Sequence, residues 1–144
     1  MTKVKIVYRL AKRKDCQGIL EVNEKSLPVV YSRYDWEMMV NQKMTYIVTQ
    51  SALIVGYITC DKSGCIVSFA VSESHRHQGL GRQLLKYCLE EMKKLNYKRL
   101  ILRVKVSNHI AHQLYLSQGF KDAELLSNYY EDGCDGMLMS YECS

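Results

Sequence analysis

The feature that most constrains the fold is a strand pattern, a two-glycine turn and an amphipathic helix pattern in direct succession. The strand pattern is GCIVSFAVS at 64–72, and the turn is SHRHQGLG at 74–81. After the turn, one helix face of apolar residues predicts a helix of about 17 residues, or roughly 25 Å. These residues are Leu80, Leu84, Leu85, Cys88, Leu89, Met92 and Leu95. Another strand pattern, RLILRVKV, follows at 99–106, so we expect a crossover with parallel pairing of the two strands.

The rest of the chain contains further strand and helix patterns, without a linker or an internal repeat. Strands at 44–50, 52–60 and 64–72 are separated by short turns, which favours an antiparallel meander. We also expect strands at 4–10 and 137–143 and helices at 12–25, 35–42 and 108–118, the last with Ser107 as its N-cap and Gly119 as its stop. This order favours an α/β or α+β sandwich with a mixed sheet.

Length and composition indicate one ordinary globular domain. The 144 residues are 47% hydrophobic and 24% charged, so we expect a single domain over residues 1–144. No apolar run approaches the roughly 20 residues that span a bilayer, and the start MTKVKIVYRLAKRKD has no secretory h-region. We therefore expect a cytoplasmic protein without a membrane partner.

Charge and cysteine spacing narrow the range of partners. The net charge of +5 favours anionic ligands but is too small to indicate direct nucleic-acid binding. The six cysteines form no C-x-x-C pair and share no zinc-site spacing with histidine. We therefore expect free thiols and no bound metal.

The two glycines of the turn are suited to anion binding. They let consecutive backbone N–H groups point into one concavity where the next helix begins and its dipole is positive, which favours phosphate. His75, Arg76, His77 and Arg82 add charge, or the capacity for it, around the turn. The spacing argues against two common phosphate loops, because Leu84 replaces the third small residue of a dinucleotide fingerprint and no Walker Gly-Lys-Ser/Thr follows.

A second motif downstream indicates which family the turn belongs with. The run 76–81, Arg-His-Gln-Gly-Leu-Gly, resembles the R/Q-x-x-G-x-G/A pyrophosphate loop of the GNAT superfamily of N-acetyltransferases. The run 107–115, SNHIAHQLY, followed by Gly119 and Phe120, is similar to that family's N-x-x-A-x-x-L/F-Y segment ending in G-F. The resemblance extends over nearly the whole chain. It implies the GNAT fold, with a mixed central sheet of about six or seven strands flanked by about four helices.

Within this superfamily the chain most resembles the catalytic subunits of protein N-terminal (N-α) acetyltransferases. The run SFAVSESHRHQGLG resembles their core, and NYYEDG resembles the late hairpin that covers the peptide. The run LPVVY at 27–31 is similar to the loop that lines the first-residue pocket in the branch that acts on a retained initiator methionine. The resemblance implies acetyl transfer from acetyl-CoA to the α-amine of a protein or peptide N-terminus, by direct attack in a ternary complex. It also leaves room for a ribosome-associated auxiliary subunit.

The resemblance implies roles for individual residues. Acetyl-CoA is the implied co-substrate, with its pantetheine paired to the backbone of Phe69, Ala70 and Val71. Its other implied contacts are Arg76, His77, Gln78, Gly79, Leu80, Gly81, Arg82, Asn108 and Tyr115. Tyr115 matches the family's general acid, which donates toward the CoA sulfur. The implied contacts of the peptide acceptor are Leu27, Pro28, Val29, Tyr31, Tyr129 and Tyr130.

The family's general base has no counterpart in this chain. Arg103, Val29 and Cys65 stand where related N-terminal acetyltransferases have, in turn, a glutamate or histidine, a glutamate, and a tyrosine. Arginine cannot accept a proton at neutral pH. An α-amine with a pKa near 7.8 is already about one-fifth neutral in the cytosol, so water relayed to backbone carbonyls or to a tyrosine is expected to take the proton. His109 and His112 are expected to face outward.

Two other functions fit the same sequence. One keeps the fold and acetyl-CoA but takes a small amine, such as a polyamine or an aminoglycoside, which the basic net charge disfavours. The other is a weakly active acetyl-CoA-binding subunit, which the missing base suggests.

Overall fold

The structure, a computed structural model, describes residues 4–143. Within them run seven β-strands: β1 Ile6–Leu10, β2 Thr45–Gln50, β3 Leu53–Cys60, β4 Ile66–Val71, β5 Arg99–Lys105, β6 Lys121–Leu126 and β7 Gly136–Glu142. The four α-helices of the described residues are α1 Cys16–Ser26, α2 Arg33–Asn41, α3 Leu80–Lys94 and α4 His109–Ser117. Short 3₁₀ turns precede two of these helices, η1 Arg13–Asp15 before α1 and η2 Glu73–His75 before α3. The chain forms two compact units, a first unit up to Glu91 and a second unit from Met92 onward.

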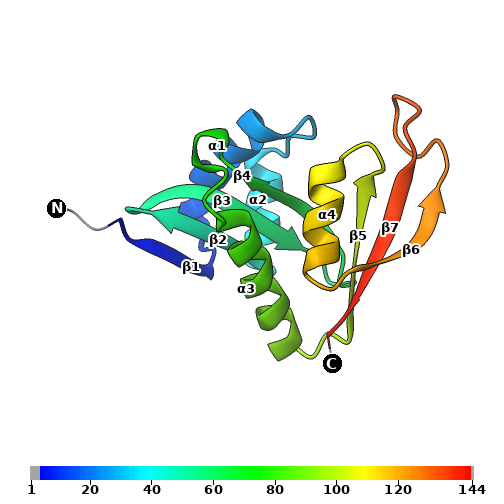
Figure 1. Cartoon of the computed structure of the whole chain (residues 1–144). Coiled ribbons are helices and arrows are strands. Elements are labelled where there is room, and N and C mark those ends of the chain that lie inside the picture. Colours follow the sequence, from blue (N-terminus) through cyan, green and yellow to red (C-terminus); the bar gives the residue numbers. More distant parts are fainter. Residues whose placement is uncertain (1–3, 144) are drawn as a thin grey trace. The chain divides into compact units, whose positions relative to one another are not determined.

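The first unit is a four-stranded antiparallel sheet in the order β1-β2-β3-β4, with helices on both faces (Figure 1). Because side chains alternate along a strand, Tyr57 of β3 faces α1 and α2, whereas Cys60 faces α3. On the α3 face, the Cys60 and Cys88 sulfurs lie 3.6 Å apart. Alternate residues of a strand therefore pack into two separate layers, one on each face of the sheet.

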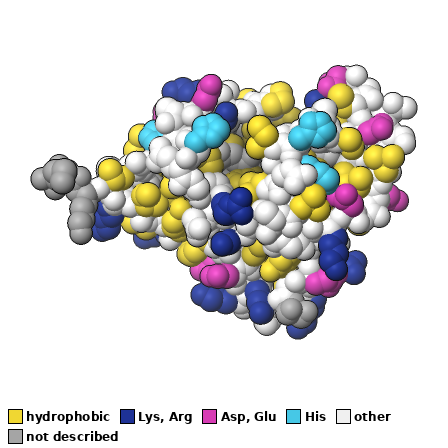
Figure 2. Space-filling view, in the orientation of Figure 1, with side chains coloured by type: hydrophobic (Ala, Val, Ile, Leu, Met, Phe, Trp, Pro, Cys, Tyr) yellow, Lys and Arg dark blue, Asp and Glu magenta, His cyan; other side chains and the backbone are white. Residues whose placement is uncertain are grey.

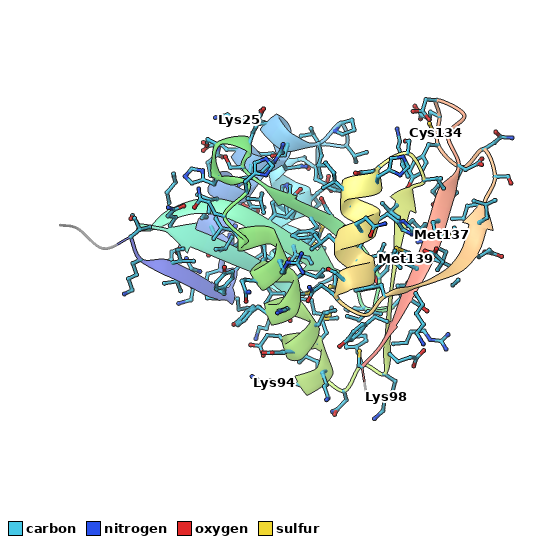
Figure 3. All side chains as sticks on the ribbon, viewed as in Figure 1. Lys25, Lys94, Lys98, Cys134, Met137 and Met139 are labelled. Atoms are coloured by element: carbon cyan, nitrogen blue, oxygen red, sulfur yellow. The ribbon has the colours of Figure 1, made fainter. Side chains whose placement is uncertain are left out.

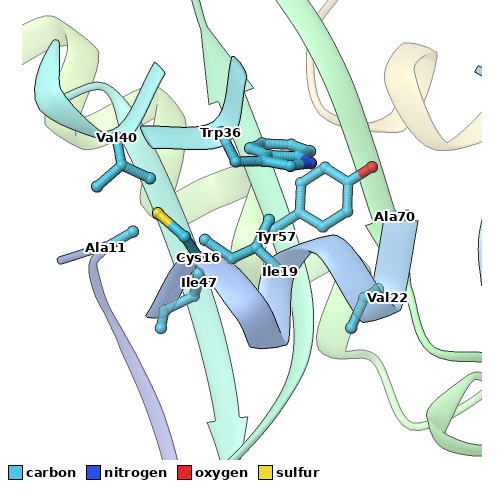
Figure 4. Close-up of a cluster of buried hydrophobic side chains, with 9 residues drawn as sticks. All are labelled: Ala11, Cys16, Ile19, Val22, Trp36, Val40, Ile47, Tyr57 and Ala70. Carbon is cyan, nitrogen blue, oxygen red and sulfur yellow. The ribbon is translucent and has the colours of Figure 1, made fainter. Parts of the chain in front are cut away.

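A buried aromatic cluster fills the layer between the sheet and the helices α1 and α2 (Figure 4). Trp36 is fully buried, and its ring packs edge-on against Tyr57, with ring centroids 4.9 Å apart. Ile19 and Val22 of α1 lie four and one residues before Asn23 on the same buried face, as the helical period requires. The side chains of Leu27 and Tyr31 pack against the edge of this cluster.

The second unit is a three-stranded antiparallel sheet in the order β5-β7-β6, with α4 packed against β5. Phe120 follows the αL residue Gly119, whose φ of +100° ends α4. The Phe120 ring lies between Tyr115 and Tyr141, with ring centroids at 5.7 and 5.3 Å. Met139 of β7 is fully buried, and Figure 3 shows it beside Met137 on the same strand. Among the described residues, no helix is long and apolar enough to cross a membrane.

The structure confirms the α+β alternative of the predicted class, the strand and helix numbers and the meander of β2, β3 and β4. The parallel pairing predicted across the helix crossover is wrong. In the described residues β4 pairs only with β3 and β5 only with β7, both antiparallel, so two antiparallel sheets replace one mixed sheet. A long crossover allows parallel pairing but does not force it, and the C-terminal strand β7 is the partner that β5 takes.

Two local predictions also differ from the structure. The N-cap of α4 is Asn108, not Ser107, because the Asn108 side-chain oxygen accepts the Ala111 N–H at 3.2 Å. Strand β6 had no predicted counterpart. Its sequence KDAELL is charged and mostly exposed, so it lacks the alternation that marks a strand.

Candidate active site

Strand β4 presents backbone hydrogen-bonding groups along an open edge. Ser72 N–H donates to the Val55 carbonyl at 2.7 Å, so at this end of the strand alternate residues point toward β3. Ala70 therefore directs its N–H and C=O toward β3, and Phe69 and Val71 direct theirs the other way. No strand of the described residues pairs with that edge. The Val71 carbonyl on that edge accepts the Arg76 Nε, and an extended chain with amide groups could lie alongside the same edge.

The turn that follows β4 gathers unpaired backbone N–H groups. His77 and Gly79 both have left-handed φ angles, +65° and +77°, a conformation found in backbone loops that hold anions. In the part of the chain that the structure describes, no acceptor faces the N–H groups of His77, Gln78, Gly79, Leu80 and Gly81. The first backbone hydrogen bond of α3 is Gln83 N–H to the Gly79 carbonyl. The arrangement suits an anion at the positive end of α3.

Side chains support this turn in unequal ways. The Arg76 Nε donates to the Val71 carbonyl at 3.0 Å and so ties the turn back to the end of β4. Gln78 is exposed, whereas Leu80 is buried, so only one of these two side chains is free of packing. A Cβ on Gly81 would lie 3.5 Å from a methyl of Val71, which shows how closely the helix start approaches the strand. Figure 2 shows histidine side chains over the turn and basic side chains along α3.

The loop between α1 and α2 contains the predicted acceptor residues Leu27, Pro28, Val29 and Tyr31. Leu27 and Tyr31 pack against the buried cluster, while Val29 is 60% exposed. One buried side chain, Asn23, holds this loop: its amide donates to the Val29 carbonyl at 2.9 Å, and its oxygen accepts the Tyr31 N–H at 2.9 Å. Sequence reasoning missed Asn23. A polar residue four positions after Ile19 on a buried helix face was the available signal.

Tyr115 lies on α4 in the second unit. Burial of its hydroxyl raises the pKa of Tyr115 to about 12, and the nearby Tyr130 hydroxyl adds to the shift. Tyr115 is therefore neutral and able to donate a hydrogen bond throughout the physiological range. Asn108 is one of the predicted cofactor contacts. Its side-chain oxygen accepts the Ala111 N–H and so caps the same helix, and its NH₂ group can donate to a ligand.

Tyr129 and Tyr130 lie in the loop between β6 and β7, the hairpin that also carries Cys134 (Figure 3). Their rings meet edge-on with centroids 5.0 Å apart. The Lys105 ammonium lies 5.3 Å from the Tyr130 ring centroid and 2.8 Å from an Asp132 oxygen. This lysine, with the Cys134 N–H, lowers the pKa of Asp132 to about 2. The second unit thus orders this loop by a charged contact and by an N–H bond from Asn128 to Asp135.

Arg103, His109 and His112 of the second unit differ in their surroundings. His109 and Arg103 are exposed, and the His112 Nε2 lies 2.7 Å from an Asp122 oxygen on β6. The imidazole of His112 is thus engaged within its own unit. Two shallow pockets of about 490 and 480 Å³ in the first unit include none of the predicted site residues. Within residues 4–143, no group of three or more His, Cys, Asp or Glu is placed to hold a metal ion.

Comparison with known proteins decides the family. A family model described as "Acetyltransferase (GNAT) family" matches residues 7–120, which include the turn, α3 and α4. The chain belongs to this family. The expected family and the N-acetyltransferase class are thereby confirmed.

Relatives of this GNAT protein cover nearly its full length. The N-alpha-acetyltransferase of Sulfurisphaera tokodaii is 33% identical, and the match covers 92% of each chain. Ard1 from Thermoplasma volcanium shares the fold, with a TM-score of 0.87 at 24% identity, over 95% of this chain and 97% of that one. Arabidopsis thaliana Naa50, solved in complex with the bisubstrate analogue CoA-Ac-MVNAL, gives a TM-score of 0.81 at 23% identity, over 95% and 98% of the two chains. The resemblance to N-α-acetyltransferases seen in the sequence is confirmed by the first of these.

Proposed function

We propose that this GNAT protein transfers the acetyl group of acetyl-CoA to the α-amine of a protein or peptide N-terminus. One structural observation carries the donor half: the open edge of β4 leads directly into five unpaired amides at the start of α3. The near full-length likeness to an N-alpha-acetyltransferase supports the acceptor half. The single domain, the cytoplasmic location and an auxiliary subunit stay predictions.

The donor would bind mainly through backbone groups. Phe69 and Val71 would pair with the amides of pantetheine as a strand pairs with its neighbour, and Ala70 fixes the strand to β3. The amides of His77 to Gly81 would hold the pyrophosphate, where the dipole of α3 adds to their attraction. Arg76 and Arg82 would add positive charge at the rim, and Asn108 a polar contact.

Tyr115 would donate a hydrogen bond to the sulfur that leaves as thiolate. With a pKa of about 12 against about 8.5 for a thiol, complete proton transfer from the tyrosine is uphill by about 5 kcal/mol. A hydrogen bond that strengthens as charge develops on sulfur is therefore the role that the protein environment favours.

The attacking amine would need little help to lose its proton. An α-amine is partly neutral near pH 7, whereas a lysine amine with a pKa near 10.4 is almost entirely charged. Water in contact with backbone carbonyls or tyrosine hydroxyls would accept the proton after attack. Leu27, Pro28, Val29 and Tyr31 would surround the first side chain, and Tyr129 and Tyr130 would contact the peptide backbone.

A panel of peptides tests the proposal. Purified protein, acetyl-CoA and peptides beginning with Met, Ala or Ser are expected to release CoA and to yield products acetylated at the α-amine, as read by mass spectrometry. Matched peptides with a blocked α-amine and an internal lysine are expected to give no product. Acetylation of that lysine, or preferential turnover of spermidine, would redirect the acceptor to another amine. Binding of acetyl-CoA without any turnover would instead support the subunit alternative.

A further inference from the structure

The side chain of Asn23 uses both of its N–H groups and its amide oxygen in hydrogen bonds. One N–H donates to the Val29 carbonyl at 2.9 Å, and the other lies 3.2 Å from the Tyr57 hydroxyl oxygen. The amide oxygen accepts the Tyr31 N–H at 2.9 Å. Asn23 is fully buried, so water does not compete for these groups. Three separate parts of the first unit therefore meet at one side chain.

The partners also fix the orientation of that amide. If the group turned over, its oxygen would face the Val29 carbonyl and its NH₂ would face the Tyr31 N–H, so two bonds would become two repulsions. The loop residues on either side of Val29 cannot slide along α1 without the same loss. A single arrangement of the loop is thereby selected.

The network continues from Asn23 to strand β4. Burial raises the pKa of Tyr57 to about 12, so its hydroxyl keeps its proton. That hydroxyl accepts from Asn23 and also shares a hydrogen bond with the Ser68 hydroxyl on β4, with the two oxygens 2.7 Å apart. Figure 4 shows the Tyr57 ring against Trp36 in the buried cluster, which holds the ring in place. The α1–α2 loop is thus linked through Asn23 and Tyr57 to β4, the strand proposed to pair with pantetheine.

Apolar packing alone does not hold the middle of the loop. Leu27 and Tyr31 pack against the buried cluster at its two ends, but Val29 and Val30 are 60% and 47% exposed. Pro28 has no N–H to contribute. The hydrogen bonds to Asn23 therefore hold the middle of the loop in place.

We infer that Asn23 is a positioning residue that sets the shape of the first-residue pocket by fixing the Leu27–Tyr31 loop to β4 through Tyr57 and Ser68. This inference rests on the proposed N-α-acetyltransfer and adds the determinant of acceptor choice to it. Asn23 itself does not touch the substrate. Its effect reaches the acceptor through the loop backbone.

The test compares Asn23→Leu with wild type on the Met, Ala and Ser peptide panel. The leucine keeps the volume but loses all three bonds. We expect the peptide KM to rise about tenfold and the spread of kcat/KM among first residues to narrow by about tenfold. The KM for acetyl-CoA is expected to stay within about twofold, because the turn after β4 makes no contact with Asn23. Amide hydrogen exchange in segment 27–32 is expected to quicken about tenfold.

Thr59→Val is the matched control. It removes another buried hydrogen bond of the same unit, the 2.6 Å contact between Thr45 and Thr59, and leaves the three bonds of Asn23 and the contact between Tyr57 and Ser68 in place. This variant is expected to lose stability while it keeps the wild-type peptide preference and slow exchange in segment 27–32. A shift in preference equal to that of Asn23→Leu would mean that stability, not position, governs acceptor choice, and would overturn the inference.

Two milder variants keep the inference testable if Asn23→Leu does not fold. Asn23→Asp keeps the acceptor for the Tyr31 N–H and loses both donors. Tyr57→Phe removes the hydroxyl that joins Asn23 to Ser68 and leaves the two bonds between Asn23 and the loop in place. We expect a graded narrowing of preference, larger for Asn23→Asp and about threefold for Tyr57→Phe. Fast exchange in the loop with an unchanged preference would overturn the inference while leaving the proposed function intact. If the wild-type protein gave no product acetylated at the α-amine, both the inference and the proposed function would be overturned. The wild-type panel is therefore measured before any variant.

Discussion

The turn between β4 and α3 and the loop between α1 and α2 are built in opposite ways. The turn exposes backbone: five consecutive amides without a partner, two left-handed residues and an open Gly79 around which no atom lies within 4 Å of an added Cβ. The loop is held by a side chain, because Asn23 occupies the carbonyl of Val29 and the N–H of Tyr31. The shape of the turn depends on the φ angles of its own residues. The shape of the loop depends on Asn23, a residue outside the loop.

Because of this difference, the turn and the loop tolerate different substitutions. A backbone-built anion site survives most side-chain changes but not a change that the left-handed region forbids. A side-chain-held loop can change its own exposed residues, yet it moves if its buried anchor is lost. The donor site is thus expected to be robust in sequence, and the acceptor site to be adjustable.

The largest effect is expected from a residue outside both regions. Tyr115→Phe removes the hydroxyl proposed to face the leaving sulfur, so kcat should fall about 100-fold or more. Both KM values should stay within about threefold, because neither the turn nor the loop changes. Steady-state kinetics with varied acetyl-CoA and varied peptide measures this. An unchanged kcat would remove Tyr115 from the chemical step and favour the weakly active subunit.

The second-largest effect tests whether the turn binds acetyl-CoA through its backbone amides. Gly79→Val places a β-branched residue at φ +77° in open space, so its penalty is conformational and not steric crowding. The amides should reorient, and the KM for acetyl-CoA should rise about tenfold or more. Gly133→Val is the matched control, since Gly133 has φ +83° and equally open surroundings in the second unit. It should leave the acetyl-CoA KM unchanged; an equal rise there would mean that general strain explains both.

The contrast between the two regions also explains what the sequence could and could not predict. Glycines at fixed spacing before an apolar helix carry their own signature, so the turn, α3 and the family were predictable from residues 64–95 and 107–120. Nothing in the local pattern of 27–31 reveals its anchor, because Asn23 lies six and eight residues before its two loop partners and 34 residues before Tyr57. Strand β6 was not predicted for a related reason: its pairing with β7, and not its charged sequence, makes it a strand.

The pH dependence follows from which group titrates. The pKa of Tyr115 is raised to about 12, so Tyr115 stays protonated below pH 10 and causes no loss of activity there. The peptide α-amine, with a pKa near 7.8, must be neutral to attack, so kcat/KM for the peptide should rise about sevenfold from pH 7 to pH 9 and then level. The KM for acetyl-CoA should not follow this rise. A bell-shaped profile that falls below pH 9 would instead reveal a protonated side chain that the chemistry requires.

The smallest effect is also the strictest test of the backbone-built turn. Gln78 lies between the two left-handed residues, and its side chain is exposed. Its backbone N–H faces no acceptor among the described residues. Gln78→Ala keeps that N–H and the backbone angles, so the acetyl-CoA KM, measured by CoA release, should change by less than about twofold. Arg76→Ala, which removes the bond to the Val71 carbonyl, should have the larger effect of the two, about threefold to tenfold. If Gln78→Ala raised the acetyl-CoA KM more than Arg76→Ala, the Gln78 side chain would bind the donor. The turn would then not differ from the loop in depending on backbone alone.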